Sequence, residues 1–323
     1  MKRLISAALL AVATTIGASS GALAQEYPSR AIKIISPSAP GGPTDVSARI
    51  IADRLGQVLK VPVIVENKPG GTGALAFDIV AKSPPDGYTL TVGFIAGLVF
   101  HPIMNNKLPF DAQKDFTPIA QISYSGNVLV VHSSVPATNV KEFIAYVKAQ
   151  PRPPSYGSWG NGSGGHLAGE FLKSLTGIDM VHVPYRSTSA LGTDMAGGHM
   201  LLGVLDTTNT MNHARTGRVR PIAVTGPNRS RGLPDVPTVM EQGVNYSAGI
   251  WTGILGPANI PKPIVERLNL EIGKILREPE TREKFLAATG EYPAHTTAAE
   301  FDKIIRDDYK LWRGIITDAK ITL

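Results

Sequence analysis

Residues 32–56 read IKIISPSAPGGPTDVSARIIADRLG, and this stretch decides the fold of the first part of the chain. Residues 32–35 form a short β-branched run, which predicts a buried strand. Residues 37–43 contain too much proline and glycine for either a helix or a strand. From Thr44 onward the apolar residues follow helical spacing. A strand, a flexible loop and a helix N-terminus place free backbone N–H groups and a positive dipole end at one point, and such a point can bind an anion.

The same arrangement recurs along the chain. A β-rich run at residues 61–65 precedes the glycine loop of residues 70–73 and a helix expected at 74–82. In the second half, the glycine-rich residues 160–165 lie between the end of a strand and the start of a helix expected at 167–175. Alternating strands and helices predict parallel βαβ units and an α/β fold. Such loops gather at the carboxyl edge of an open α/β sheet, where ligands bind, so we predict a binding cleft.

Length and composition exclude several classes of protein. The chain has 323 residues, enough for two domains with sizeable cores. Its formal charge of +6 becomes +4 once Lys2 and Arg3 are removed with the leader, and it has no basic run of the kind that binds nucleic acid. It has no cysteine, which excludes disulfides, thiolate metal sites and cysteine nucleophiles. We therefore expect no nucleic-acid partner and a fold stabilised by its core alone.

The N-terminus of the chain has the pattern of a secretory signal peptide, residues 1–24. Lys2 and Arg3 form a basic n-region, residues 4–16 are apolar, and Ala22-Leu23-Ala24 is a small-residue cleavage site. We expect cleavage after Ala24 and export to a bacterial periplasm. A membrane anchor is the alternative, but the apolar run is short and rich in small residues.

We predict two α/β lobes, each a mostly parallel sheet flanked by helices, with the ligand cleft between them. The chain is expected to cross between the lobes near Gly126 and again near Thr225. The first lobe then comprises residues 25–126 and 225–323, including the C-terminal helices, and the second comprises residues 127–224. Two lobes around a cleft suit a ligand trap that closes like a hinge.

Several enzyme motifs match by spacing but fail on context. Gly71-x-Gly73-x-x-Ala76 and Gly160-x-Gly162-x-x-Gly165 fit the dinucleotide fingerprint, yet neither is followed by the acidic residue that binds ribose. The seven histidines show no metal-binding spacing. A hydrolase needs a nucleophile beside a base, and the nearby candidates Ser163 and His166 would not readily align three residues apart. We expect no catalysis, no cofactor and no metal.

Short motifs follow one another over essentially the whole mature chain. They are YPSR at 27–30, GGPTD at 41–45, VENKPG at 65–70, PDGYTL at 85–90, YGS at 156–158, GNG at 160–162, HLAGE at 166–170, VHVPY at 181–185 and LPDVPT at 233–238. In this order they resemble the substrate-binding subunits of tripartite tricarboxylate transporters, also called the Bug family. The resemblance implies a periplasmic binding protein, expected to be a monomer, that closes on a small carboxylate and docks on a two-part inner-membrane permease.

The resemblance also implies the residues of the site. One ligand carboxylate is expected at the first two loops, held largely by backbone N–H groups and bridging waters, with loops of the second lobe completing the site. His166 either contacts the ligand or orients its loop through a hydrogen bond, and Arg186 either pairs with a distal carboxylate or has a solvent-exposed or structural role. The expected ligand-binding residues are Ser38, Pro40, Gly41, Gly42, Thr44, Asp45, Gly71, Thr72, Gly73, Ile95, Ala96, Asn161, Gly162, Ser163, His166, Arg186 and Asp206.

Two departures from the family pattern bear on the ligand. Ser38 stands where members commonly carry an aromatic residue, and the apolar residues 94–98 replace a segment often rich in serine and threonine. A polar ligand group left unpaired there would cost about 1–3 kcal/mol. We therefore predict a ligand with an apolar or aromatic middle, such as an aromatic mono- or dicarboxylate. The alternatives are that Phe94 and Leu98 only pack the lobe core, that the ligand is an aliphatic di- or tricarboxylate or an acidic amino acid, or that the protein serves a membrane sensor.

Overall fold

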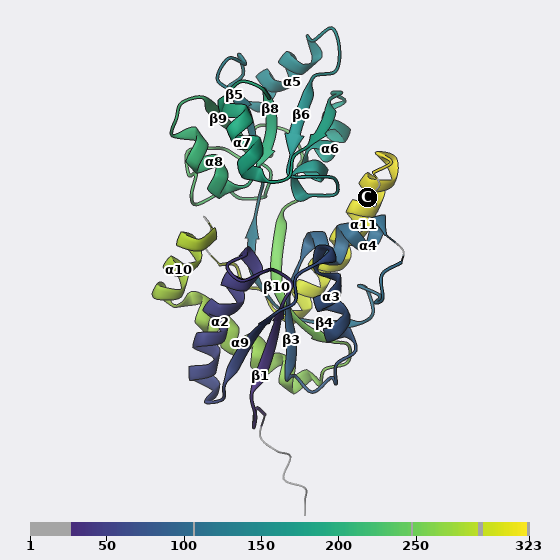
Figure 1. Ribbon diagram of the computed structural model, residues 1–323, viewed down its shortest axis with the longest axis vertical. Coiled ribbons are helices and arrows are strands. Elements are labelled where there is room, and N and C mark those ends of the chain that lie inside the picture. Colours follow the sequence, from purple (N-terminus) through teal and green to yellow (C-terminus); the bar gives the residue numbers. More distant parts are fainter. Residues whose placement is uncertain (1–26, 106, 247, 290–292, 322–323) are drawn as a thin grey trace, which may run out of the picture.

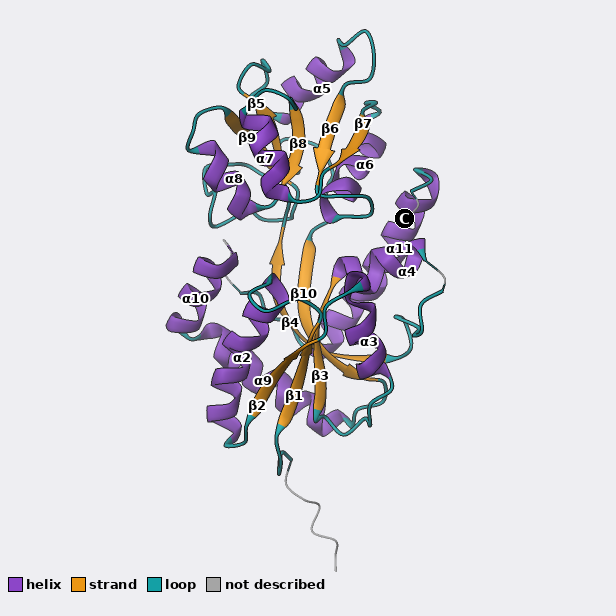
Figure 2. Ribbon diagram, in the orientation of Figure 1, coloured by secondary structure: helices purple, strands orange, loops and turns teal. Residues whose placement is uncertain are grey.

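The computed structural model describes residues 27–105, 107–246, 248–289 and 293–321. It shows two lobes arranged along the long axis of the molecule (Figure 1). Each lobe contains one five-stranded sheet with helices packed against it (Figure 2), which confirms the predicted fold class. The predicted signal peptide lies outside the described residues. Within the described ranges, no helix combines the length and the apolar character needed to cross a membrane.

The first sheet has the strand order β2-β1-β3-β10-β4. Strands β1, β2 and β3 are parallel, whereas β10 is antiparallel to both of its neighbours. The carboxyl ends of the three parallel strands therefore meet at one edge of the sheet. The strand bounds are β1 Ile32–Ser36, β2 Val63–Asn67, β3 Thr89–Phe94, β4 Phe116–Ser125 and β10 Ile250–Pro257.

Helices cover both faces of this sheet. On one face, α2 and α9 enclose a core that includes Ile51, Ile254 and Leu268. On the other face, α3 and α11 pack through Phe77, Phe301 and neighbouring residues. The helices of this lobe are α2 Pro43–Leu59, the 3₁₀ turn η1 Gly71–Gly73, α3 Ala74–Ala81, the π-helix η2 Ala96–Phe100, α4 His101–Met104, α9 Lys262–Arg277, α10 Pro279–Thr289 and α11 Ala298–Asp318.

The second sheet has the strand order β7-β6-β8-β5-β9, and β5 is its antiparallel strand. As in the first lobe, the three parallel strands β6, β7 and β8 end at a common edge. The strands are β5 Val128–His132, β6 Ser155–Ser158, β7 Val181–Pro184, β8 Leu202–Leu205 and β9 Val219–Val224, and the helices are α5 Val140–Lys148, α6 Gly164–Thr176, α7 Thr188–Ala196 and α8 Thr207–Ala214.

The antiparallel strand in each sheet follows from the way in which the chain passes between the sheets. Strand β4 leaves the first sheet and continues through Gly126 and Asn127 into β5, and the chain returns from β9 to β10. Figure 1 shows β4 and β10 side by side as they run toward the second lobe. At the crossing, Asn127 N donates to Thr225 Oγ1 at 2.9 Å, and Thr225 N donates to Asn127 O at 2.8 Å. The two connections are thus tied together where the sheets meet.

Two elements differ from the sequence-based expectations. Strand β4 was not expected as a ten-residue strand, because Pro118 interrupts its pattern; the structure places it at the edge of the first sheet, where a proline is tolerated. Helix α8 was not expected either, because its threonines and asparagines have weak helix propensity. Its start is stabilised by Asp206, whose side chain accepts a hydrogen bond from Asn209 N at 2.7 Å.

The contact between the two crossings gives a stability prediction. A Cβ added to Gly126 would lie 2.4 Å from the backbone N of Gly226, so Gly126→Ala must displace one connection from the other. We expect a loss of about 1–3 kcal/mol in the free energy of unfolding, measured by urea denaturation. Gly314→Ala on α11 is the matched control, because its Cβ meets nothing within 4 Å. That change should raise the stability by about 0.5–1 kcal/mol, and equal effects of the two variants would contradict the prediction.

Candidate ligand-binding site

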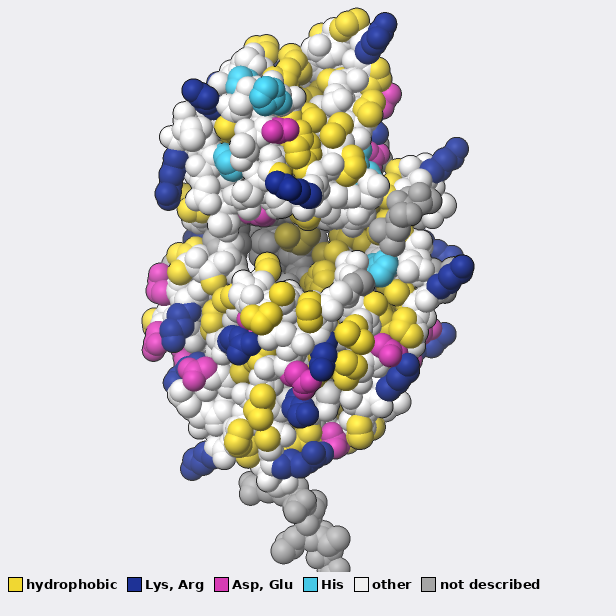
Figure 3. Space-filling model, in the orientation of Figure 1, with side chains coloured by type: hydrophobic (Ala, Val, Ile, Leu, Met, Phe, Trp, Pro, Cys, Tyr) yellow, Lys and Arg dark blue, Asp and Glu magenta, His cyan; other side chains and the backbone are white. Residues whose placement is uncertain are grey.

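A cavity of about 320 Å³ lies between the lobes, where β1 and β3 end. The first lobe supplies most of its wall, and the second supplies Trp159 and Gly164. Figure 3 shows the molecule hollowed between the lobes, with hydrophobic side chains inside the hollow. The cavity is lined by Ser38, Pro43, Thr44, Phe94, Ile95, Ala96, Phe100, Ser123, Ser125, Trp159, Gly164, Ile250, Trp251 and Thr252.

Hydroxyl groups line part of this cavity. Ser38 Oγ lies 2.6 Å from Thr44 Oγ1, which also lies 3.3 Å from the buried Ser36 Oγ. On the paired strands β4 and β10, Ser123 Oγ and Thr252 Oγ1 are 2.7 Å apart. A hydroxyl can donate to one group while it accepts from another, so these pairs can turn a proton toward an oxyanion. Polar groups thus enter the cavity from the first loop and from the paired strands β4 and β10.

The N-terminus of α2 lies at this cavity. The helix begins at Pro43 after Gly42, and no side chain caps it. Its first-turn N–H groups therefore lack the partner that a capping residue gives, and they carry the positive end of the helix dipole. In the second lobe the corresponding helices are capped by their own side chains: Ser163 caps α6, Ser187 caps α7 and Asp206 caps α8. The anion-binding capacity predicted for these loops is thus concentrated in the first lobe.

Asp45 holds the first loop in place. Its buried carboxylate accepts hydrogen bonds from Gly41 N at 2.8 Å, from Asn67 Nδ2 at 2.7 Å and from Arg49 Nε at 3.0 Å. Asn67 Nδ2 also donates to Ser38 O at 2.9 Å, which ties the loop to the end of β2. Burial alone would raise the pKa of Asp45, but the hydrogen bonds from Arg49, Gly41 and Asn67 lower it. Asp45 is therefore an ionised group that shapes the loop from behind.

A pair of histidines supports the loop of the second lobe. Gly162 N donates to His166 Nδ1 at 3.1 Å, so this ring orients the loop, one of the two roles expected for it. The His166 ring stacks on His182 with 3.7 Å between centroids, and His182 Nε2 lies 2.7 Å from Ser158 Oγ. Burial lowers the pKa of both histidines to about 4. Both rings are therefore neutral at pH 7.

Trp251 forms a rigid part of the wall. Its side chain is buried, its ring lies edge-on to Phe301 at 5.2 Å, and its Nε1 donates to Asp308 Oδ2 at 2.8 Å. Burial raises the pKa of Asp308 to about 6. The C-terminal helix α11 thus braces the cavity wall from the far side of the sheet.

Four of the expected ligand-binding residues line the cavity, namely Ser38, Thr44, Ile95 and Ala96. The others lie in the loops around it or behind it. Pro40, Gly41, Gly42 and Asp45 belong to the first loop and the start of α2, Gly71, Thr72 and Gly73 form η1, and Asn161, Gly162, Ser163 and His166 form the loop and first turn of α6. Asp206 is occupied as a helix cap, and Arg186 is exposed on the loop after β7. Their contact with a ligand stays a prediction.

The sequence reasoning missed most of the lining on the hinge strands. Ser123 and Ser125 alternate along β4, and Ile250 and Thr252 alternate along β10. This period of two places each pair on one face of its strand, a signal that could have been read once β4 was recognised. Trp159 could have been found too, because it directly follows the end of β6. Phe100 belongs to the π-helix η2, a conformation that often occurs at functional sites.

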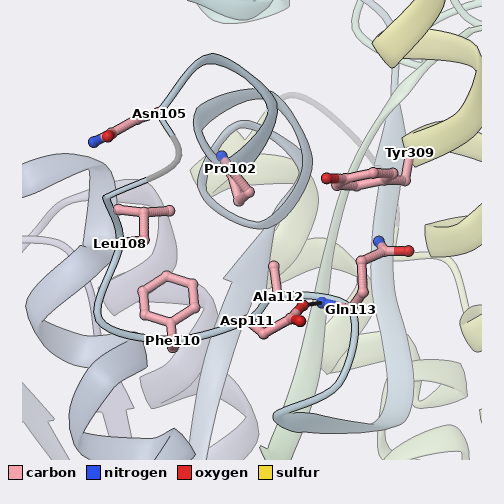
Figure 4. A pocket seen from close by; sticks show the side chains of 8 residues that line it. All are labelled: Pro102, Asn105, Leu108, Phe110, Asp111, Ala112, Gln113 and Tyr309. Carbon is pink, nitrogen blue, oxygen red and sulfur yellow. Dashed lines mark hydrogen bonds between the residues drawn. The ribbon is translucent and has the colours of Figure 1, made fainter.

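A further cavity, of about 300 Å³, lies on the first lobe alone (Figure 4). Tyr309 from α11 lies on one side of it, and Leu108 and Phe110 lie on the opposite side (Figure 4). Asp111 contributes a carboxylate, which accepts a hydrogen bond from Gln113 N at 2.9 Å. Asp111 is also paired with Lys114, whose Nζ lies 2.9 Å from its Oδ2. The lining residues that the structure describes all belong to the first lobe. This cavity therefore lacks the features of the cleft.

The bonds of Asn67 yield a first prediction for the site. Asn67→Ala removes the two hydrogen bonds that hold Asp45 and Ser38 O, so we expect a loss of about 1–2 kcal/mol in the free energy of unfolding. Urea denaturation at pH 7 measures it. The exposed Asn212 on α8 offers a control, since Asn212→Ala should change stability by less than about 0.5 kcal/mol. An Asn67→Ala protein as stable as the control variant would refute the role given to this network.

The buried histidines predict a pH dependence. Their folded pKa values of about 4 lie below the ordinary value of 6.5, so the unfolded chain binds more protons between these pH values. The stability that they contribute is therefore complete above pH 6.5 and falls as the pH drops toward 4. Asp308 has the opposite effect on the pH dependence of stability. Its folded pKa of about 6 lies above its ordinary value of 3.8, so the stability that it contributes falls as the pH rises from 3.8 toward 6.

Comparing the pH dependence of stability in the parent and in His166→Asn isolates the contribution of the buried histidine. His166→Asn, which keeps an acceptor near Gly162 N, should lose less stability than the parent when the pH is lowered from 7 to 4.5. Urea denaturation at both pH values measures this, with the exposed His199→Asn as the matched control. If stability depended on pH identically in the parent and in His166→Asn, the buried ring would not be the source of the pH dependence.

Comparisons with known proteins agree with this architecture. Residues 47–321 match the tripartite tricarboxylate transporter family receptor. Protein BugT of Bordetella pertussis is 30% identical over 329 residues, covering 99% of each chain. The structure of a TctC solute binding protein from Polaromonas has a TM-score of 0.82 at 29% identity, covering 90% of this chain and 99% of the other. An R. palustris protein solved with adipate has a TM-score of 0.75 at 30% identity, and the match covers 92% of this chain and 99% of the other. The chain therefore belongs to the tripartite tricarboxylate transporter receptor family of periplasmic solute-binding proteins, which are not enzymes.

Proposed function

We propose that the protein captures an organic carboxylate with an apolar or aromatic middle and delivers it to a two-part inner-membrane permease. The observation that carries this proposal is the composition of the cavity between the lobes. Hydroxyl groups and the uncapped N-terminus of α2 lie beside aromatic and aliphatic walls. Lysine and arginine are absent from the lining residues that the structure describes. A carboxylate suits such a site because its single charge can be held by N–H groups and hydroxyls.

The apolar walls favour a ligand whose middle is apolar. Phe94, Phe100 and Ile250 line the cavity, and their side chains offer no hydrogen bond to a hydroxyl or amine on the ligand. Trp159 adds a further aromatic surface with a single N–H donor. Each such group left unpaired would cost about 1–3 kcal/mol. The R. palustris relative was solved with adipate, whose two carboxylates are separated by methylene groups only. An aromatic mono- or dicarboxylate has the same division into charged ends and an apolar centre.

Capture requires the second lobe to close over the ligand. We propose that residues 25–126 with 225–323 form one lobe and residues 127–224 the other, and that the two turn about the paired crossings at Gly126 and Thr225. Segment 228–234 is an exception within the first range, because Leu233 packs against the core of the second lobe. Trp159 and Gly164 are the parts of the second lobe that reach the cavity, so they would cover a ligand held by the first lobe. A ligand that contacts both lobes favours the closed state by its greater affinity for it.

Thermal unfolding of the mature protein with a panel of carboxylates tests the ligand class. The panel holds terephthalate, phthalate, benzoate, adipate, citrate, succinate, aspartate and glutamate. A ligand at about 100 times its dissociation constant should stabilise the fold by about 2.7 kcal/mol. We expect stabilisation by acids with an apolar or aromatic middle. Stabilisation by citrate or the amino acids alone would overturn the apolar ligand, and no response to any acid would overturn carboxylate capture.

A charge placed in the cavity tests the position of the site. Ser38→Asp puts a carboxylate beside Thr44 and the start of α2, and it should weaken binding of the stabilising acid by roughly tenfold or more through repulsion. Calorimetric titration measures the affinity. Ser189→Asp, at an exposed position on α7, is the matched control and should leave the affinity unchanged. Unchanged affinity in Ser38→Asp would move the site elsewhere. Uptake lost in cells that lack the permease, with signalling intact, would separate transport from a sensor role.

A further inference from the structure

A polar cavity of about 590 Å³ lies at the crossing between the lobes, apart from both the cleft and the cavity of Figure 4, and is called the second cavity below. It shares no lining residue with the cleft cavity. We propose that it binds a small oxyanion, with inorganic phosphate as the test case, held by arginines on both lobes and by the buried Ser230 hydroxyl. The lining residues are Tyr124, Asn228, Arg229, Ser230, Arg231, Pro234, Arg282 and Pro293.

Both cavities adjoin strand β4. Ser123 and Ser125 line the cleft cavity, whereas Tyr124 between them lines the second one. Tyr124 pairs directly with Trp251, which lines the cleft, so the two cavities adjoin neighbouring parts of β4 and β10 but share no lining residue among the described residues. An anion in the second cavity would therefore be distinct from the ligand of the cleft.

The charge of the lining is one-sided. Among the lining residues that the structure describes, three are arginines and none is aspartate or glutamate. Arg229 Nε donates to both carboxylate oxygens of Glu241, at 3.0 and 2.9 Å, and Arg229 Nη1 donates to Pro234 O at 3.2 Å. Arg231 and Arg282 also interact with other groups of the chain. Because a guanidinium carries five N–H donors in a planar fork, such contacts orient it and still allow further donation to an oxyanion.

Ser230 supplies the independent sign of a ligand. Its side chain is only 3% exposed, and in the part of the chain that the structure describes its Oγ has no hydrogen-bond partner. Buried hydroxyls are normally paired, so an unpaired one at the wall of a basic cavity calls for a missing partner. An oxyanion in the cavity would accept this hydrogen bond together with those of the arginines.

The walls of the cavity come from both lobes. Leu233 packs against the second-lobe core around Val128 and Leu191, which places the segment 228–234 with that lobe. Arg282 lies on α10 of the first lobe, and Pro293 is bridged to Ser123 of β4. An anion held between Arg282 and the arginines of segment 228–234 would join the two lobes beside the hinge.

Calorimetric titration of the mature protein with inorganic phosphate at constant ionic strength is the test. We expect one phosphate per chain, with affinity reduced roughly tenfold or more by Arg282→Gln and by Ser230→Ala. Arg313→Gln, at an exposed position on α11, is the matched control and should leave the affinity unchanged. Ser230→Ala removes a hydroxyl that is unpaired in the free protein, so it should weaken phosphate binding without lowering the melting temperature.

Either of two results with the parent and the second-cavity variants would overturn the proposal, and a third result, with a cleft variant, would do so as well. One is the absence of saturable phosphate binding up to 10 mM, roughly the upper limit for a weak site. The other is an affinity that is the same in the parent, Arg282→Gln and Ser230→Ala. Ser38→Asp in the cleft keeps this test independent of the carboxylate proposal. Phosphate binding that survives Ser38→Asp belongs to the second cavity, whereas binding lost in that variant belongs to the cleft and refutes the second site.

Discussion

The uncapped N-terminus of α2 is the constraint on which the rest of the cleft depends. A helix that starts without a capping side chain leaves N–H groups without partners, and such groups must meet water or a ligand. Here the first turn opens into the cavity between the lobes, with Ser38 and Thr44 beside it. The loop before the helix cannot collapse onto these groups, because Asp45 and Asn67 hold it through Gly41 N and Ser38 O. The proposed anion site is thus kept open by contacts that lie behind it.

The two lobes use the same βα geometry in different ways. In the second lobe, the side chains of Ser163, Ser187 and Asp206 satisfy the helix N-termini from within. The stacked pair His166 and His182 then fixes the loop after β6, where both rings are buried and neutral. A lobe whose helix starts are already satisfied offers little to an anion, and it reaches the cavity mainly through Trp159. The first lobe is therefore suited to hold the charged end of a ligand and the second to cover its apolar part.

The parts of the fold that follow from local pattern could be predicted from the sequence. The strand, loop and helix of residues 32–59 are such a case, because β-branching, proline and glycine content and helical spacing all change within a few residues. The start of α2 could not be predicted in this way: Thr44 and Asp45 both suit an N-cap position, whereas the structure places Gly42 there and describes no side chain that caps the helix. The pairing of Ser123 with Thr252 could not be predicted, because it joins residues 129 positions apart and depends on the register of β10 against β4. The stacking of His166 on His182 likewise depends on how α6 packs over the sheet.

The hinge strands explain why a cleft site and a site at the crossing can coexist in one chain. The residues that line the cleft, Ser123 and Ser125, and the residue that lines the second cavity, Tyr124, are consecutive along β4. The same strand continues through Gly126 into β5, and its partner β10 follows the return crossing. Any turn of one lobe against the other must therefore move both cavities, since each has walls on both lobes. A ligand in either one gains contacts only in the lobe arrangement that fits it, and this is the physical condition for one site to influence the other.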